Sequence, residues 1–150
     1  MSIIAWDGTC IAADRRSSNN DFGFVGGKLI EVVRGHVRFI VGWTGICENG
    51  LALLRWFEQG ERETDWPKCQ TKEDWCRLII LNMNHNQIVT YEQHPIAQPL
   101  HPENKFMAWG AGRDFALGAM AAGKTAIEAV EIASQFCNSC GNGVDVFRVD

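Results

Sequence analysis

Four residues of the chain have types and spacing that could perform chemistry: Ser2, Asp14, Lys28 and Gly45. A serine hydroxyl at the start of a chain becomes a nucleophile when its own free α-amine, with an ordinary pKa near ~8, takes the hydroxyl proton. Such a site also needs a nearby cation, a carboxylate that orients the cation, and backbone N–H donors for a developing oxyanion. The chain offers one candidate for each part, provided that Met1 is removed and Ser2 carries the amine.

Two hairpins are predicted to position these residues. The predicted strands before residue 43 are 2–6, 9–13, 28–33 and 36–41. Asp7-Gly8 is typical of a two-residue turn between the first two strands, and Arg34-Gly35 of a turn between the next two. The polar segment 14–21 predicts a loop. Asp14 therefore follows the second strand, and Lys28 begins the third.

The rest of the chain predicts helices and further strands. Thr44 is a candidate cap for a helix over about 45–59, which Gly60 would end. Gly123 would close a later helix, and Thr125 with Glu128 fits a capping box that starts the next one. The further predicted elements are a polar connection over 61–73, a hairpin of 75–81 with 87–91, a strand over 105–109, helices over 113–122 and 126–136, and a strand over 144–149. This order fits a layered α+β fold better than a βαβ alternation.

Length and composition favour one domain over residues 1–150. The chain is 46% hydrophobic, and a chain of this length buries roughly two-thirds of the surface that its unfolded form exposes. The net charge of −4 comes from 14 basic and 18 acidic residues, and neither sign forms a long block. We therefore expect no nucleic-acid partner and no polybasic membrane contact.

The sequence predicts a cytoplasmic protein. Its first residues lack the basic start and the apolar run of a secretory signal, and no stretch is long and apolar enough to span a bilayer. The six cysteines are accordingly expected to be mostly reduced.

Five segments, taken together in order and spacing, resemble the proteasome β-subunit family of N-terminal-nucleophile hydrolases, including small bacterial or phage-type members. They are Ser2-Ile3-Ile4-Ala5, Ile11-Ala12-Ala13-Asp14-Arg15-Arg16, Gly27-Lys28-Leu29-Ile30-Glu31, Val41-Gly42-Trp43-Thr44-Gly45 and Trp109-Gly110-Ala111-Gly112. The resemblance implies a four-layer αββα sandwich, in which two antiparallel sheets lie between layers of helices. It also implies a peptidase or amide hydrolase of the threonine-peptidase type, acting on a peptide or protein and assembled into a homo-oligomeric ring. It leaves open whether an ATPase acts as a partner.

The resemblance also assigns roles to individual residues. Ser2 would be the nucleophile and, through its amine, the base. Asp14 and Lys28 would form the supporting ion pair, and the N–H of Gly45 would donate to the oxyanion. Ser18 and Trp43 would contact the substrate, with Trp43 at the floor of a specificity pocket that favours a small side chain.

The register of the first hairpin supports Ser2 over Met1 as the nucleophile. The resemblance implies that longer family members carry about four more residues in this hairpin, which a tight turn removes equally from both strands. An even deletion keeps every side chain on its face of the sheet. Ser2 then stands opposite the family's nucleophile.

Two departures from the family pattern keep other functions open. The family commonly has a serine where this chain has Ala111, and its acidic residue and serine before the last strand fall at Cys137 and Cys140. One alternative is therefore a catalytically inactive scaffold or binding module of the same fold. Another is an amidohydrolase that acts on a small amide.

Three motifs are interpreted as structural, and no cofactor or metal is predicted. The segment 118–125 matches the phosphate-loop pattern, but its alanines continue a helix and no strand precedes it. The pair Gly110 and Gly112 lacks the third glycine of a dinucleotide site. Cys137 and Cys140 have redox or zinc spacing, but no second cysteine pair exists and the histidines show no ligand spacing, so we interpret the pair as packing.

Overall fold

The computed structural model describes residues 2–18 and 23–149. The chain divides into two compact units, which are Met1–Leu29 with Pro102–Asp150 and, between them, Ile30–His101. The described residues form antiparallel sheets and three α-helices, which confirms the α+β class. No helix among them has the length and apolar character needed to cross a bilayer.

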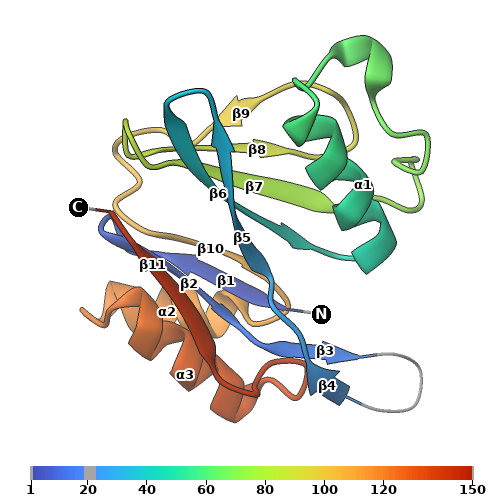
Figure 1. The fold of residues 1–150 in the computed structure, drawn as a ribbon. Helices are drawn as coiled ribbons and strands as arrows, with labels where there is room; N and C mark the ends of the chain where they lie inside the picture. The colour runs from blue at the N-terminus through green and yellow to red at the C-terminus, as the bar shows by residue number, and fades with distance from the viewer. Residues whose placement is uncertain (1, 19–22, 150) are drawn as a thin grey trace. The chain divides into compact units, whose positions relative to one another are not determined.

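The first unit is built on a four-stranded antiparallel sheet in the order β10-β1-β2-β11. Its strands are β1 (Ile3–Trp6), β2 (Cys10–Asp14), β10 (Met107–Gly110) and β11 (Val144–Arg148). Every residue of the two central strands is buried, which is why both read as continuous apolar runs. Helices α2 (Arg113–Ala121) and α3 (Ala126–Phe136) lie against one face of this sheet (Figure 1).

The turn of the first hairpin differs from the prediction. Gly8-Thr9, not Asp7-Gly8, forms its tip, because the N–H of Asp7 donates to the carbonyl of Cys10 at 3.2 Å. Asp7 is instead an Asx-turn residue, whose Oδ1 accepts the N–H groups of Thr9 and Cys10 and the hydroxyl of Thr9. Trp6 consequently pairs with Ile11 and not with Thr9. This shift of two residues leaves every side chain on its predicted face.

Small residues let α2 and α3 pack closely on the sheet. The buried alanines of the two helices meet Ile3, Ala5 and Ala12 in one core cluster; they are Ala116, Ala119, Ala126, Ala129 and Ala133. The predicted capping box is confirmed, since Thr125 Oγ1 accepts the N–H of Glu128 at 3.2 Å and Glu128 Oε1 accepts the N–H of Thr125 at 3.2 Å. The residues of the phosphate-loop pattern continue α2 and then cap α3, as predicted.

The loop predicted over 14–21 is partly wrong. Strands β3 (Arg16–Ser18) and β4 (Gly23–Val25) pair into a two-stranded antiparallel sheet, while residues 19–22 lie outside the described part of the chain. Neither strand has the alternating apolar pattern that predicts a strand. The two strands pair through backbone hydrogen bonds, which do not require apolar side chains.

The second unit contains a five-stranded sheet in the order β5-β6-β7-β8-β9. Its elements are β5 (Leu29–Arg34), β6 (Val37–Thr44), α1 (Cys47–Glu58), the 3₁₀ helix η1 (Glu63–Asp65), β7 (Arg77–Asn82), β8 (Gln87–Tyr91) and β9 (Gln98–Pro99). Leu53, Trp56 and Phe57 on α1 pack against the sheet residues Val41, Leu78 and Ile80. Helix α1 thus covers one face of this sheet (Figure 1).

Both ends of α1 are explained by backbone geometry. The predicted cap is wrong, because Thr44 is the last residue of β6 and the helix begins at Cys47 without a side-chain cap. The predicted stop is confirmed: the N–H of Gly60 donates to the carbonyl of Phe57 and that of Glu61 to the carbonyl of Trp56, as in a Schellman motif.

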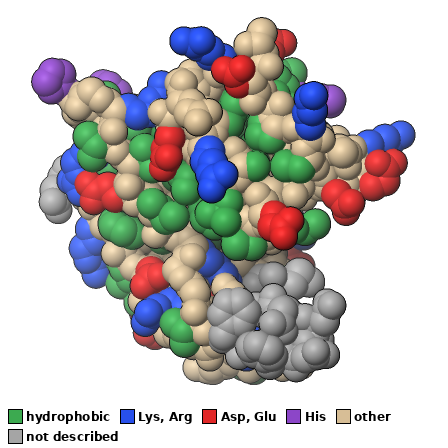
Figure 2. All heavy atoms as spheres, turned by 45° about the vertical axis from the view of Figure 1, so that its right-hand side comes forward, with side chains coloured by type: hydrophobic (Ala, Val, Ile, Leu, Met, Phe, Trp, Pro, Cys, Tyr) green, Lys and Arg blue, Asp and Glu red, His purple; other side chains and the backbone are tan. Residues whose placement is uncertain are grey.

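Charged side chains of both signs are interspersed on the face shown in Figure 2, and neither sign dominates it.

Candidate active site

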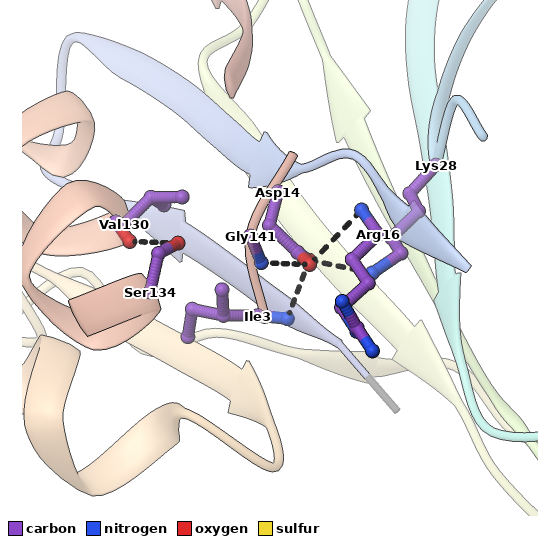
Figure 3. A network of polar contacts seen from close by, with 7 residues as sticks. All are labelled: Ile3, Asp14, Arg16, Lys28, Val130, Ser134 and Gly141. Atoms are coloured by element: carbon purple, nitrogen blue, oxygen red, sulfur yellow. Dashed lines mark hydrogen bonds and ion pairs between the residues drawn. The ribbon is translucent and has the colours of Figure 1, made fainter. Parts of the chain in front are cut away.

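The centre of the candidate site is the buried carboxylate of Asp14, the last residue of β2. Its Oδ1 accepts hydrogen bonds from the backbone N–H of Ile3 at 3.0 Å and from Lys28 Nζ at 2.6 Å. Its Oδ2 accepts the N–H groups of Gly141 at 3.0 Å and Arg16 at 3.3 Å. Four donors from separate chain segments therefore converge on this carboxylate among the described residues (Figure 3).

Lys28 places an ammonium charge in this buried environment. Its side chain is 9% exposed and that of Asp14 is 0% exposed. Burying two charges costs free energy that their attraction does not fully return, and an apolar pair of similar volume is often as stable. The ion pair is therefore poorly explained by stability alone, and its position beside Ile3 brings a positive charge to the residue that follows Ser2.

Ser2 is held close to this pair by the segment after β10. Its carbonyl accepts the N–H of Gly112 at 3.4 Å, and Ile3 pairs with Gly110 across the sheet. A Cβ atom on Gly110 would collide with the carbonyl group of Ser2 and would stand 3.3 Å from its Oγ. Gly110 also has a φ of +107°. Glycine is therefore favoured here for two reasons: a side chain would collide with Ser2, and the backbone conformation is one that other residues rarely adopt. Ser2 is 4% exposed.

The loop after α3 completes the carboxylate's environment, and the sequence did not predict its role. Gly141, Asn142 and Gly143 have φ values of +150°, +63° and +99°. The carbonyls of Gly141 and Gly143 accept the N–H of Arg15 at 3.0 and 3.2 Å, while the N–H of Gly141 donates to Asp14. The sequence Gly141-Asn142-Gly143 could have indicated this loop, because glycine and asparagine are the residues that most readily adopt a positive φ.

The structure thus brings together three of the predicted site residues, which are Ser2, Asp14 and Lys28. Ala111 is exposed and its methyl group cannot form a hydrogen bond, so it supplies no hydroxyl to this site. Met1, whose removal the chemistry requires, lies outside the described residues.

Gly45 and Trp43 belong to the second unit. Gly45 lies between β6 and α1 with a φ of +115°, and a Cβ there would come within 2.9 Å of Cys76 Cβ. The indole of Trp43 is buried against Gly50 on α1, where any Cβ would collide with the ring. Ser18 ends β3, and its side chain lies outside the described part of the structure.

Cys10 and Cys76 are buried thiols. All six cysteines of the chain are free. Burial, with hydrogen bonding to Asp7, raises the pKa of Cys10 to about 11, and burial raises the pKa of Cys76 to about 12. Among the described residues, no three histidine, cysteine or acidic side chains gather in a way that could hold a metal ion.

Comparison with known proteins shows the fold. No family model matches the sequence, and no curated protein matches it. Among solved structures, HslV from Trypanosoma brucei is 15% identical, with a TM-score of 0.69 over 98% of this chain and 97% of that one. Thiobacillus denitrificans BPH is 23% identical, with a TM-score of 0.68 over 99% and 98% of the two chains. The Anbu complex from Pseudomonas aeruginosa, described as a helical assembly, is 13% identical, with a TM-score of 0.71 over 99% and 80%.

These similarities show a proteasome-like fold. At such identities the likeness concerns the fold alone.

Proposed function

We propose that the protein is an N-terminal-nucleophile peptidase or amide hydrolase that uses Ser2 after removal of Met1. The observation that carries this proposal is the shared oxygen of Asp14: Oδ1 accepts both the N–H of Ile3 and the ammonium of Lys28. The cation is thereby fixed beside the residue bonded to Ser2. We also propose the helix-sheet-sheet-helix layer order that the family resemblance implies, and the match to HslV over 98% of this chain supports it.

Removal of Met1 changes the chemistry of the Ser2 nitrogen. A peptide N–H cannot accept a proton, whereas a free α-amine with an ordinary pKa near ~8 can take one from the Ser2 hydroxyl. The oxygen then attacks the carbonyl carbon of the substrate amide. The positive charge of Lys28 favours the deprotonated oxygen, and the carboxylate of Asp14 holds the ammonium in place.

Three further proton transfers complete the reaction. The protonated amine gives its proton to the leaving nitrogen as the amide C–N bond breaks, which leaves an acyl ester on Ser2. The amine then takes a proton from water as the water oxygen attacks the ester carbon. When the bond between the acyl carbon and the Ser2 oxygen breaks, the amine returns that proton to the Ser2 oxygen, and a carboxylic acid is released. We propose that the N–H of Gly45 donates to the oxyanion, because Gly45 precedes a helix start, where amide groups lack intrahelical partners.

The proposal extends to substrate and assembly. Trp43 is proposed as a substrate contact, and its ring, which packs against Gly50, would leave room only for a small substrate side chain. Ser18 is proposed as a second substrate contact. A homo-oligomer is proposed, supported by the description of the similar Anbu structure as a helical assembly.

The test begins with the N-terminus. Intact-protein mass spectrometry should show a chain that starts at Ser2, and such protein should hydrolyse fluorogenic peptides with small residues before the scissile bond. Ser2→Ala should be inactive and Ser2→Thr should keep activity, because threonine retains both the hydroxyl and the amine. Equal activity of Ser2→Ala and the unmodified protein would rule the mechanism out.

A catalytically inactive scaffold is the second candidate, and Ala111 favours it because the hydroxyl implied by the resemblance is missing. Protein that begins at Ser2, forms the oligomer and still hydrolyses neither peptides nor small amides would establish this alternative. Hydrolysis of small amides alone would instead identify an amidohydrolase.

A further inference from the structure

Cys137 and Cys140 lie at the two ends of a tight turn that follows α3. The N–H of Cys140 donates to the carbonyl of Cys137 at 3.1 Å. A four-residue turn closed in this way keeps its first and last α-carbons within about 7 Å, which overlaps the separation that a disulfide spans. Both residues are free thiols in the structure.

The two thiols differ in access to solvent. Cys140 is 5% exposed within the core cluster of the first unit, whereas Cys137 is only partly buried. Burial raises the pKa of Cys140 to about 12, and a hydrogen bond to Cys137 and the negative charge of Asp14 add to this effect. Cys137 is therefore the thiol that an external reagent reaches first, and Cys140 is placed to react with the sulfur of Cys137.

The residue after Cys140 is joined to the candidate site. The N–H of Gly141 donates to Asp14 Oδ2 at 3.0 Å, and its carbonyl accepts the N–H of Arg15 at 3.0 Å. Cys140 itself has little free space, since a Cβ on Gly112 would stand 3.1 Å from its Sγ. Any displacement of Cys140 toward Cys137 must therefore be taken up by the turn and by Gly141.

We propose that Cys137 and Cys140 form an oxidation site, which closes to a disulfide by exchange with a small-molecule disulfide and thereby weakens the hydrogen bond from Gly141 to Asp14. The site goes beyond the proposed hydrolysis and does not depend on it.

The exchange proceeds in two steps. The thiolate of Cys137 attacks one sulfur of oxidised glutathione, a mixed disulfide forms, and one glutathione thiolate leaves. Cys140 loses its proton as its sulfur attacks that of Cys137, the protein disulfide forms, and the second glutathione leaves. The two protein thiols lose two electrons and two protons, and oxidised glutathione gains both as two thiols. Because the closed loop is short, the disulfide gains little from loop closure and reverses readily in excess thiol.

The experiment uses the full chain with its exposed cysteines removed by Cys47→Ser and Cys69→Ser. After incubation with oxidised glutathione, peptide mass spectrometry should find the peptide containing 137–140 lighter by two hydrogens, and reduced glutathione should restore it. Adding Cys140→Ser should stop the reaction at a glutathione adduct on Cys137. Adding Cys137→Ser should prevent any adduct, because Cys140 is buried.

A second measurement follows the coupling to Asp14. In the oxidised protein, amide hydrogen exchange at Gly141, measured by NMR, should be about tenfold faster, since its hydrogen bond to a charged acceptor is weakened. The N–H of Ala129, which donates to Thr125 within α3, is the internal control and should exchange unchanged. A glutathione adduct that never closes would overturn the oxidation site, and closure without a change at Gly141 would overturn the coupling.

Discussion

The carboxylate of Asp7 and the backbone N–H of Ala126 are 119 residues apart in the sequence and are joined by a hydrogen bond of 2.8 Å. This bond ties the first hairpin to the first residue of α3, where backbone N–H groups lack intrahelical partners and a negative charge is favourable.

Asp7 should make stability depend on acid pH. Partial burial raises its pKa, but N–H groups of Ala126, Thr9 and Cys10 and the hydroxyl of Thr9 outweigh this effect and lower the pKa to about 2. Because the folded pKa lies below the unfolded value of about 4, the contribution is complete above pH ~4 and is lost as pH falls toward ~2. We expect about 1–2 kcal/mol after allowance for solvent screening. Denaturant unfolding of wild type and Asp7→Asn between pH 2 and 6 measures it.

The same substitution at Asp114, whose side chain is 87% exposed, provides the control for that experiment. Asp114 accepts a hydrogen bond from the Arg113 side chain and none from a backbone N–H in the described part of the chain, so a change that appears in both variants does not come from the backbone contacts of Asp7. A wild-type profile that matches the Asp7→Asn profile would show that Asp7 has no such role.

The cap of α3 should be separable from its packing. Thr125→Ala removes the hydroxyl that accepts the N–H of Glu128, and should lower the unfolding free energy by about 1 kcal/mol. Thr125→Ser keeps the hydroxyl and should stay within about 0.5 kcal/mol of wild type. Thermal and denaturant unfolding measure both, and an equal loss in the two variants would show that the methyl group matters instead.

Lys28 should be required for the proposed hydrolysis even in a variant whose stability has been restored. Lys28→Met leaves the carboxylate of Asp14 buried without its cation, and should cost about 3–5 kcal/mol of stability as well as the proposed hydrolysis. Adding Asp14→Asn removes the unpaired charge and should restore much of the stability but none of the activity. A double variant that regains hydrolysis would assign the pair a purely structural role.

Gly110 should be required by the position of Ser2. Gly110→Ala suffers both a positive φ and a collision with the Ser2 carbonyl, whereas Gly123→Ala, at a φ of +94°, meets no atom within 4 Å. The positive φ costs each variant about 1–2 kcal/mol. The collision should cost Gly110→Ala a further ~1–3 kcal/mol, together with the proposed activity. Equal unfolding free energies for Gly110→Ala and Gly123→Ala would show that the backbone around Gly110 and Ser2 can move apart without a cost in stability.

Much of the fold could be predicted because side-chain patterns determine it. The apolar runs of β1 and β2 and the capping box of Thr125 and Glu128 are properties of side chains, and the structure confirms them. Asp14 and Lys28 were predictable as a pair only through the family resemblance, since nothing in their spacing brings them together.

The features that the sequence did not predict are mainly backbone features. The donors Gly141 and Arg16 contact Asp14 through main-chain N–H groups, which every residue except proline carries and no pattern reveals. Likewise, β3 and β4 pair without an apolar alternation, and the end of β6 absorbs Thr44, which local propensity placed at a helix cap.

The convergence of donors on Asp14 has a consequence for the order of folding. Two of its hydrogen bonds close over sequence separations of 11 and 127 residues, and contacts of the longer kind form late because much chain entropy must be lost first. A nascent chain can assemble the opening hairpin long before residue 141 has been synthesised. We therefore expect Asp14 to lack the hydrogen bond from Gly141 in incompletely synthesised chains. The final geometry of the carboxylate is then reached late in folding.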